Sequence, residues 1–143
     1  MGRFYRLLLD DYSAASFTSF DKDYYSTLEE INEFFEEMKG KALAFGINES
    51  SLCYDCGIGF GKTREDDIEL LKNCRSLSEY SPLLIGVSRK RVIGELTGAL
   101  NPKDRVAGSV SAAVCCAKSG AGVLRVHDVK ETADALIVAD ILL

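Results

Sequence analysis

The chain has 143 residues, of which 47% are hydrophobic and 27% charged, and its formal net charge is -5. An acidic chain without a basic stripe binds a phosphate backbone poorly, so we expect no nucleic acid partner. No segment reaches the roughly 18 apolar residues of a membrane span, and the N-terminus lacks a signal-peptide pattern, so we expect no membrane partner and place the protein in the cytoplasm.

The first predicted helix follows a segment that stays poorly assigned. In residues 1–23, the stretch 4–9 is compatible with a strand, but 13–23 mixes polar and aromatic residues without a period. Ser26 and Glu29 then have the spacing of a capping box, and Gly46 offers a C-cap. Between them, apolar residues recur at helical spacing: Leu28, Ile31, Phe35, Met38, Ala42 and Phe45.

Three units of a strand followed by a helix are predicted downstream. Thr63 with Asp66, and Asp128 with Glu131, have the spacing of helix N-caps, and Gly120 ends a helix of small residues that suits close packing. This alternation implies parallel strands with right-handed crossovers. The strands are expected at 52–54, 83–87 and 123–126, and the helices at 64–77, 103–119 and from 129 onwards.

The five cysteines are an odd number without the spacing of a disulfide framework. Cys53 and Cys56 form a C-x-x-C pattern, which occurs in zinc and redox sites. A zinc site needs four ligands, however, and the chain has no second C-x-x-C and a single histidine. We therefore expect no metal site and interpret the cysteines, including Cys115 and Cys116, as reduced thiols packed in the core.

Three short polar segments each follow an apolar run and open a helical pattern. They place polar groups at the carboxyl ends of successive parallel strands, where the loops of α/β enzymes form active sites. We therefore interpret the chain as part of an enzyme scaffold. The segments are DCGIGFGK at 55–62, SRK at 88–90 and RVHDV at 125–129.

The glycine-rich segment fails two common nucleotide-binding patterns by one residue each. A P-loop requires a glycine where Cys56 stands, and a dinucleotide fingerprint requires one where Lys62 stands. The alternative is a tight turn from strand to helix, in which glycines supply unusual backbone angles.

Together the three segments resemble the late motifs of dihydropteroate synthase, which read roughly DPGIGFGK, SRK and RVHDV in this order and at about this spacing. Cys56 departs from the family's proline. The resemblance implies an α/β fold, a partial TIM (β/α) barrel, because a whole barrel needs about 250 residues. Residues 24–143 are then the C-terminal half of a pterin-binding barrel, with parallel strands and flanking helices, and residues 1–23 an N-terminal segment.

The resemblance implies a transferase that condenses 7,8-dihydropterin-6-ylmethyl diphosphate with p-aminobenzoate to dihydropteroate in folate biosynthesis. Pterin diphosphate and p-aminobenzoate are thus the expected partners. The implied p-aminobenzoate contacts are Ser88 and Lys90, and the implied diphosphate contacts are Arg125 and His127. The implied pterin contacts are Asp55, Gly59, Phe60, Lys90 and Arg125.

The chemistry of these side chains is consistent with those roles, although each has a plainer alternative. A carboxylate such as Asp55 accepts two hydrogen bonds from an aminopyrimidine edge, and a guanidinium such as Arg125 grips phosphate oxygens bidentately. Asp55 could instead be a helix cap, the basic run at 88–91 a solvated surface, and His127 a structural histidine.

The resemblance also implies Mg²⁺, but the family's asparagine ligand, its two mobile loops and further pterin-binding residues lie upstream of the segments matched here. We therefore expect the isolated chain to be inactive and assign no catalytic residue. Open strand edges predict either a homo-oligomer or a partner that supplies the missing N-terminal half. The alternative functions are a non-catalytic pterin-binding or oligomerisation module, or a pterin binder of the methyltetrahydrofolate methyltransferase type.

Overall fold

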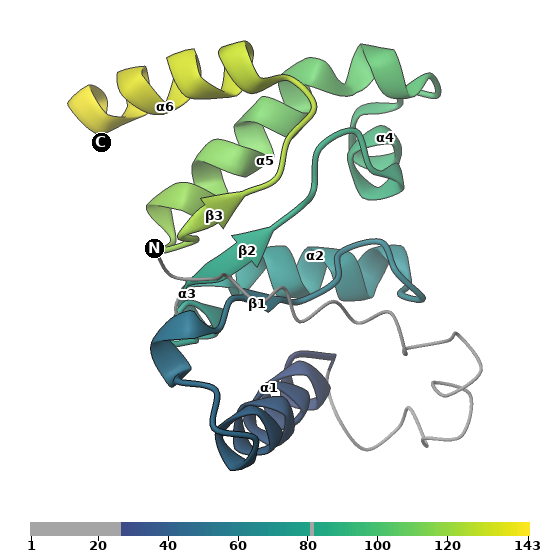
Figure 1. Ribbon diagram of the computed structural model, residues 1–143. Coiled ribbons are helices and arrows are strands. Elements are labelled where there is room, and N and C mark those ends of the chain that lie inside the picture. The colour runs from purple at the N-terminus through teal and green to yellow at the C-terminus, as the bar shows by residue number, and fades with distance from the viewer. Residues whose placement is uncertain (1–26, 81) are drawn as a thin grey trace.

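The computed structural model describes residues 27–80 and 82–143, with three short strands lying among helices (Figure 1). The strands form one parallel sheet in the order β1-β2-β3, in which Tyr54 pairs with Leu83 and Leu84 pairs with Val123. The predicted parallel strands are confirmed, although each is shorter than its apolar pattern suggested and the first begins at Tyr54, where the strand expected at 52–54 ends. The strands are β1 (Tyr54–Asp55), β2 (Leu83–Ile85) and β3 (Val123–Leu124).

Helices follow each strand, as the α/β pattern predicts. The predicted helix around 27–45 is confirmed, and Gly46 ends it with a positive φ of 77°. Ser26, the first residue of the expected capping box, and the segment 1–23 lie outside the described residues. The helices are α1 (Thr27–Ala44), α2 (Arg64–Lys72), α3 (Cys74–Leu77), α4 (Arg91–Thr97), α5 (Val106–Lys118) and α6 (Val129–Leu142), with short 3-10 turns η2 (Glu49–Ser51) and η3 (Pro102–Arg105).

Three helix predictions need correction. The single helix expected over 64–77 is broken at Asn73, whose side chain donates to the Glu69 carbonyl at 2.9 Å and so competes with the helical hydrogen bonds. The helix expected from residue 103 begins as η3, because Pro102 opens a tighter turn there. Asp128 precedes α6 but makes no capping hydrogen bond, because its carboxylate pairs with Arg89 instead.

The core lies between the sheet and the helices that cover it. Leu83 and Ile85 of β2 are buried, and the rings of Phe35, Tyr54 and Tyr80 pack with centroids 5.1 to 5.4 Å apart, which attaches α1 to β1. The small-residue helix α5 does pack closely, since a Cβ on Gly108 would lie 2.8 Å from the Ile93 side chain of α4.

The cysteines divide between core and surface. Cys56, Cys74 and Cys116 are buried in the core as expected, and Cys53 is half-buried. The expectation was wrong for Cys115, which is exposed because its position on α5 faces away from the buried Cys116 and Ala113. All five thiols are free.

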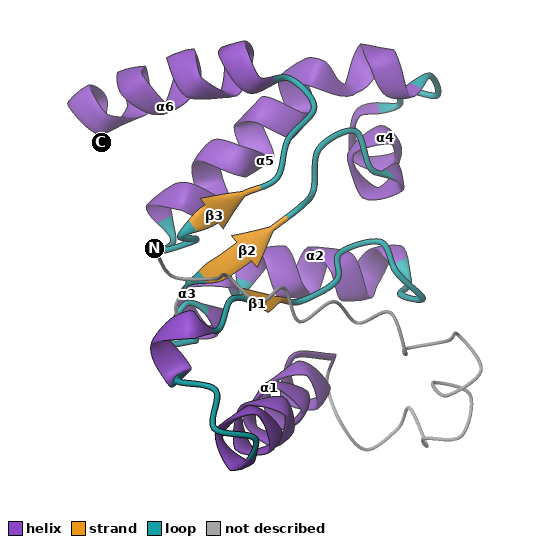
Figure 2. Cartoon of the chain, in the orientation of Figure 1, coloured by secondary structure: helices purple, strands orange, loops and turns teal. Residues whose placement is uncertain are grey.

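The loops that leave β2 and β3 run toward α4 and α6 and are drawn in teal in Figure 2. They stay close together, because the backbone N–H of His127 donates to the Ser88 hydroxyl at 3.1 Å. The chain thus brings polar residues from two strand ends to the same edge of the sheet, as a parallel arrangement requires.

Candidate functional site

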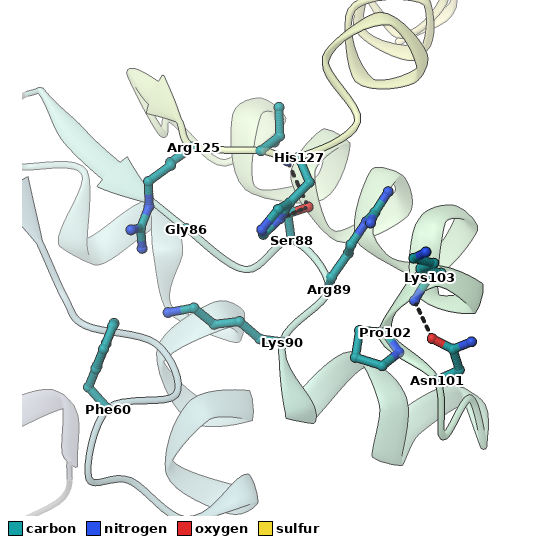
Figure 3. Close-up of a pocket in the computed structure, with 11 residues that line it drawn as sticks. Phe60, Gly86, Ser88, Arg89, Lys90, Asn101, Pro102, Lys103, Arg125 and His127 are labelled. Atoms are coloured by element: carbon teal, nitrogen blue, oxygen red, sulfur yellow. Dashed lines mark hydrogen bonds between the residues drawn. The ribbon is translucent and has the colours of Figure 1, made fainter.

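A cavity of about 640 Å³ opens at the carboxyl ends of the strands (Figure 3). Residues that follow β2 and β3 form most of its wall, and Phe60 and the start of η3 complete it. The lining contains no Asp or Glu, although the whole chain carries a net charge of -5. The lining residues are Phe60, Gly86, Ser88, Arg89, Lys90, Asn101, Pro102, Lys103, Arg125, Val126 and His127.

The residues 55–62 form a glycine turn on one side of this cavity. Gly57, Gly59 and Gly61 have φ angles of 67°, 77° and 65°, which side chains disfavour and glycine accepts. The interpretation of this segment as a strand-to-helix turn is therefore confirmed. The turn presents Phe60, whose side chain is 61% exposed, at the cavity.

Two carboxylates hold the backbone of the glycine turn by accepting hydrogen bonds from it. Asp55 accepts the backbone N–H of Gly57 at 2.9 Å, and Asp67 of α2 accepts that of Gly59 at 2.7 Å. Asp67 is itself buried, and this burial raises the pKa of its carboxyl, an effect that the Gly59 hydrogen bond opposes. Lys62 donates to the Gly57 carbonyl at 3.1 Å. Three of the hydrogen bonds that hold the turn thus join residues no more than eight positions apart in sequence.

The residues 88–90 form a basic turn that faces the glycine turn. Its Lys90 side chain extends between Arg125 and Phe60 (Figure 3), with the ammonium 4.3 Å from the centre of the Phe60 ring. The ammonium also donates to the Ile58 carbonyl. Burial lowers the pKa of Lys90, and the nearby Arg125 cation lowers it further. This lysine therefore bridges the two turns across the cavity.

Arg125 and His127 follow β3, which ends at Leu124, and both line the cavity although neither lies in the strand. Gly86 leaves room for the arginine, since a Cβ there would lie 2.6 Å from its Nη2. His127 Nδ1 lies 3.2 Å from the Ser88 hydroxyl. If that hydroxyl donates to Nδ1, the imidazole proton is on Nε2, where it can bond a ligand.

The structure gathers five of the seven predicted site residues at this cavity: Phe60, Ser88, Lys90, Arg125 and His127. Asp55 is at the end of β1 but does not line the cavity. Gly59 does not line it either and packs against the Lys90 side chain, since a Cβ built on this glycine would lie 3.1 Å from the Lys90 Cδ. Their assigned roles stay predictions.

Sequence reasoning missed the wall formed by Asn101, Pro102 and Lys103. Asn101 is the N-cap of η3 and accepts the Lys103 backbone N–H at 3.0 Å, while Pro102 takes the first position of the turn. Asparagine followed by proline is a helix-start signal, so the turn could have been expected. Its approach to the basic turn depends on contacts between distant residues and could not.

The described residues offer cations to a ligand but no clear metal site. Arg89, Lys90, Lys103 and Arg125 line the cavity, which suits a ligand with several negative charges. Within 27–80 and 82–143, no group of three or more His, Cys, Asp or Glu side chains is placed to hold a metal. None of the described helices is long and apolar enough to span a membrane.

Known proteins are similar to this chain in sequence. The profile of the family described as pterin binding enzyme matches residues 12–127. The chain is 42% identical over 83% of its length to a dihydropteroate synthase of Neisseria meningitidis serogroup B, and 39% identical over 78% of its length to that of Escherichia coli K12. It spans only 43% and 39% of those two proteins.

Solved structures agree. The dihydropteroate synthase of Xanthomonas albilineans with 4-aminobenzoic acid superposes with a TM-score of 0.81 at 45% identity, covering 83% of this chain and 44% of that one. The same enzyme in complex with 7,8-dihydropteroate also gives 0.81 at 45% identity, over 83% of this chain and 46% of that one. The predicted fold class, a partial TIM barrel, is confirmed.

Proposed function

We propose, from the premise that this chain belongs to the family of pterin-binding enzymes, that its cavity is part of the substrate site of a dihydropteroate synthase. The observation that carries the proposal is the meeting of Lys90, Arg125 and His127 with Phe60 at one cavity. Cations and an aromatic ring suit a flat heterocycle that bears a diphosphate. The Xanthomonas albilineans enzyme, solved with 4-aminobenzoic acid and with 7,8-dihydropteroate, supports the same substrate and product here.

Arg125 and His127 are proposed to hold the diphosphate. A guanidinium presents paired donors to phosphate oxygens, and Gly86 leaves the space in which this side chain lies. The Ser88 hydroxyl lies beside Nδ1 of His127, so the imidazole can present Nε2–H to a second oxygen. These donors stabilise the charge that builds up on diphosphate as it departs.

The pterin and p-aminobenzoate are proposed to lie on either side of Lys90. Asp55, Gly59 and Phe60 come from the glycine turn, and their side of the cavity is assigned to the pterin. Burial and Arg125 lower the pKa of Lys90, and the nearby Asp55 carboxylate opposes that shift. Ser88 and Lys90 are assigned to the carboxylate of p-aminobenzoate.

The reaction that fits these groups is a displacement at the pterin's methylene carbon. The amine nitrogen of p-aminobenzoate forms a bond to that carbon, the carbon–oxygen bond breaks with its electron pair leaving on the diphosphate oxygen, and the nitrogen releases a proton to solvent. Arg125, His127 and Lys90 supply positive charge toward the departing group. Magnesium is implied by the family, but the described residues provide no ligand set, and no step is assigned to it.

The 143-residue chain by itself is expected to lack measurable synthase activity. It spans about two fifths of its relatives, and correct placement of both reactants needs groups from around the whole site. The test is a steady-state assay of the pure chain with both substrates and magnesium. A turnover number of about 10 s⁻¹, which is typical of enzymes, would contradict this expectation.

Binding tests the site directly. Calorimetry should show pterin diphosphate binding to the chain, and Asp55→Ala should weaken it at least tenfold, since a hydrogen bond to a charged group contributes about 1.5–3 kcal/mol. Asp140→Ala is the matched control, because its exposed carboxylate pairs with Lys118 on the neighbouring helix, and Asp140 is absent from the residues that line the cavity. Equal affinity of the Asp55 variant and the parent would show that Asp55 does not contact the pterin.

We also infer that the chain associates with a second copy and works in the cytoplasm. β1 and β3 each have one neighbouring strand in the described sheet, and α6 exposes Ile137, Ile141 and Leu142. Unpaired edges and apolar faces favour association. Five free thiols suit a reducing compartment. Light scattering over a dilution series should show a dimer or larger species, and a monomer at every concentration would contradict the association.

A further inference from the structure

The basic turn contains a backbone conformation that its own residues do not favour. Arg89 has a φ of 57°, and it is the one residue other than glycine with a positive φ among those described. A Cβ is crowded in this region, so surrounding contacts must hold the residue there. Arg89 stands between Ser88, which touches His127, and Lys90, which reaches Phe60. The direction of both neighbours depends on this one angle.

Two residues of the next segment hold the peptide groups of Arg89. Its backbone N–H donates to the Ser109 hydroxyl at 2.8 Å, and its carbonyl accepts from Nη1 of Arg105 at 3.0 Å. Ser109 is buried in α5 and donates in turn to the Arg105 carbonyl at 2.6 Å. The three residues therefore form a closed set of hydrogen bonds around the turn.

Arg105 is fixed as firmly as the turn that it supports. Its guanidinium also donates to the carbonyls of Ala99 at 2.9 Å and Leu100 at 2.7 Å. Gly94 of α4 leaves the space for it, since a Cβ there would lie 2.5 Å from Nε of Arg105. The Arg89 side chain is anchored separately by Asp128, with Nε 3.0 Å from Oδ2.

We propose that Ser109 and Arg105 are positioning residues of the substrate site, which hold Arg89 in its left-handed conformation so that Ser88 faces His127 and Lys90 faces Phe60. Neither residue lines the cavity. This inference rests on the proposed function for its meaning, because the residues they place are the proposed contacts of diphosphate and p-aminobenzoate. Its first test needs no ligand.

The chain provides a matched control on the same helix. Ser111 donates to the Ala107 carbonyl at 2.9 Å, just as Ser109 donates to that of Arg105. Ser111 is exposed, however, and within the described residues it does not bond the basic turn. Ser111→Ala removes the helical serine bond alone. Ser109→Ala removes that bond and also the acceptor for the Arg89 N–H. The difference between the two variants isolates the positioning role.

The first readout is the titration of Lys90, followed by NMR at its side-chain carbon next to nitrogen. The groups that face this ammonium are Arg125 after β3, Asp55 at the end of β1, Asp67 on α2 and Cys56. Burial and Arg125 together hold the pKa of Lys90 below its usual range. If Arg89 relaxes in Ser109→Ala, Lys90 leaves this place and its pKa rises, whereas Ser111→Ala leaves the pKa unchanged.

The second readout is affinity for pterin diphosphate by calorimetry. Ser109→Ala is expected to weaken binding about tenfold, in line with the loss of one or more charge-assisted contacts, and Ser111→Ala to leave it unchanged. If the parent chain does not bind pterin diphosphate at all, the proposed function fails, while the Lys90 titration still decides the positioning role.

A second variant covers the possibility that Ser109→Ala fails to fold. Arg105→Lys keeps the positive charge but cannot reach three carbonyls with one planar fork, so it should raise the pKa of Lys90 in the same direction. Thermal unfolding establishes that each variant is folded before it is titrated. A folded Ser109→Ala or Arg105→Lys in which Lys90 titrates as in the parent would overturn the proposal.

Discussion

The two turns that face the cavity solve the same problem in different ways. Each follows a strand, opens a helix and needs a positive φ. The glycine turn takes it at Gly57, Gly59 and Gly61, and side chains no more than eight residues away bond its backbone, although Lys90 also reaches its Ile58 carbonyl from the basic turn. The basic turn takes it at Arg89 and is tied by residues 16, 20 and 39 positions away.

The difference teaches where each half of the site is encoded. The backbone conformation of the glycine turn is determined by its own residues, because glycine adopts these positive φ angles without steric strain. The conformation of the basic turn is instead held by hydrogen bonds to Ser109 of α5, to Arg105 and to Asp128 before α6. One half of the site should therefore form early and locally, and the other only when the helices have packed.

The largest effect is expected from placing a side chain in the glycine turn. Gly59→Ala meets both an unfavourable φ and the Lys90 Cδ at 3.1 Å, so it should lower the free energy of unfolding by about 2 kcal/mol. Gly61→Ala meets the φ alone and should lose about 1 kcal/mol. Chemical denaturation measures both.

Gly40→Ala in α1 is the control for that pair, since nothing lies within 4 Å of its added Cβ and alanine favours a helix. It should gain up to about 1 kcal/mol. If Gly59→Ala were as stable as the parent, the glycine turn would not depend on its own glycines, and the contrast between the turns would disappear.

Gly86 tests a different role of glycine, in which the missing side chain leaves room for Arg125 and no unusual backbone angle is needed. Its added Cβ would lie 2.6 Å from Nη2 of Arg125, the far end of a flexible side chain that can move away. Gly86→Ala should therefore leave stability within about 0.5 kcal/mol while weakening pterin diphosphate binding about tenfold. Calorimetry and thermal unfolding on the same sample separate the two effects. A loss of stability without loss of binding would mean that Gly86 serves the fold.

A smaller effect is expected when the basic turn is given a glycine at its strained position, as the glycine turn has. Replacing Arg89 by glycine removes the crowding of its Cβ, so the turn should no longer need Ser109 for its backbone angle. Ser109→Ala should cost about 1 kcal/mol in the parent and less in the Arg89→Gly background. A double-mutant cycle by denaturation measures this coupling. Strictly additive effects would show that Ser109 does not act through Arg89.

The smallest expected effects are opposite pH dependences of the two turns. The hydrogen bond from Arg89 lowers the pKa of Asp128, so this carboxylate stabilises the fold above its unfolded pKa of about 3.8 and loses that contribution as pH falls through its folded pKa. Burial raises the pKa of Asp67, so its ionisation opposes folding as pH rises above about 3.8.

Two isosteric variants separate these contributions. Asp128→Asn should be less stable than the parent at neutral pH, and the gap should be narrower at about pH 3. Asp67→Asn should compare more favourably with the parent at neutral pH than at about pH 3. Denaturation at both pH values gives the four differences. Gaps that change in the same direction for both variants would contradict the assignment of the two carboxylates.

The contrast between the turns also explains what sequence could predict. The parallel strands, the glycine turn and the first helix follow from local patterns of apolar residues, caps and glycines. Asn73, which breaks the helix after the glycine turn, was missed because its side chain competes with the helix by a bond that periodicity does not show. α4 was missed because it is only seven residues long and its N-cap residue, Lys90, makes no capping hydrogen bond through its side chain.

The candidate site was predictable to the same extent. The cations and the histidine were identified because their motifs sit at strand ends, and the structure gathers them at one cavity. The pairing of Asp128 with Arg89 was not, because a carboxylate before a helix normally caps it and only the packed structure offers it a guanidinium 39 residues away. Ser109 and Arg105 carried no local signal at all.

The central claim is that the cavity between the two turns binds pterin diphosphate. The most direct measurement is NMR of the isotope-labelled chain during titration with this ligand. The account predicts saturable shifts of the backbone signals of Lys90, Arg125 and His127, with the signals of α1 left unchanged. No shifts at millimolar ligand, or shifts confined to α1 and the far end of α6, would contradict it.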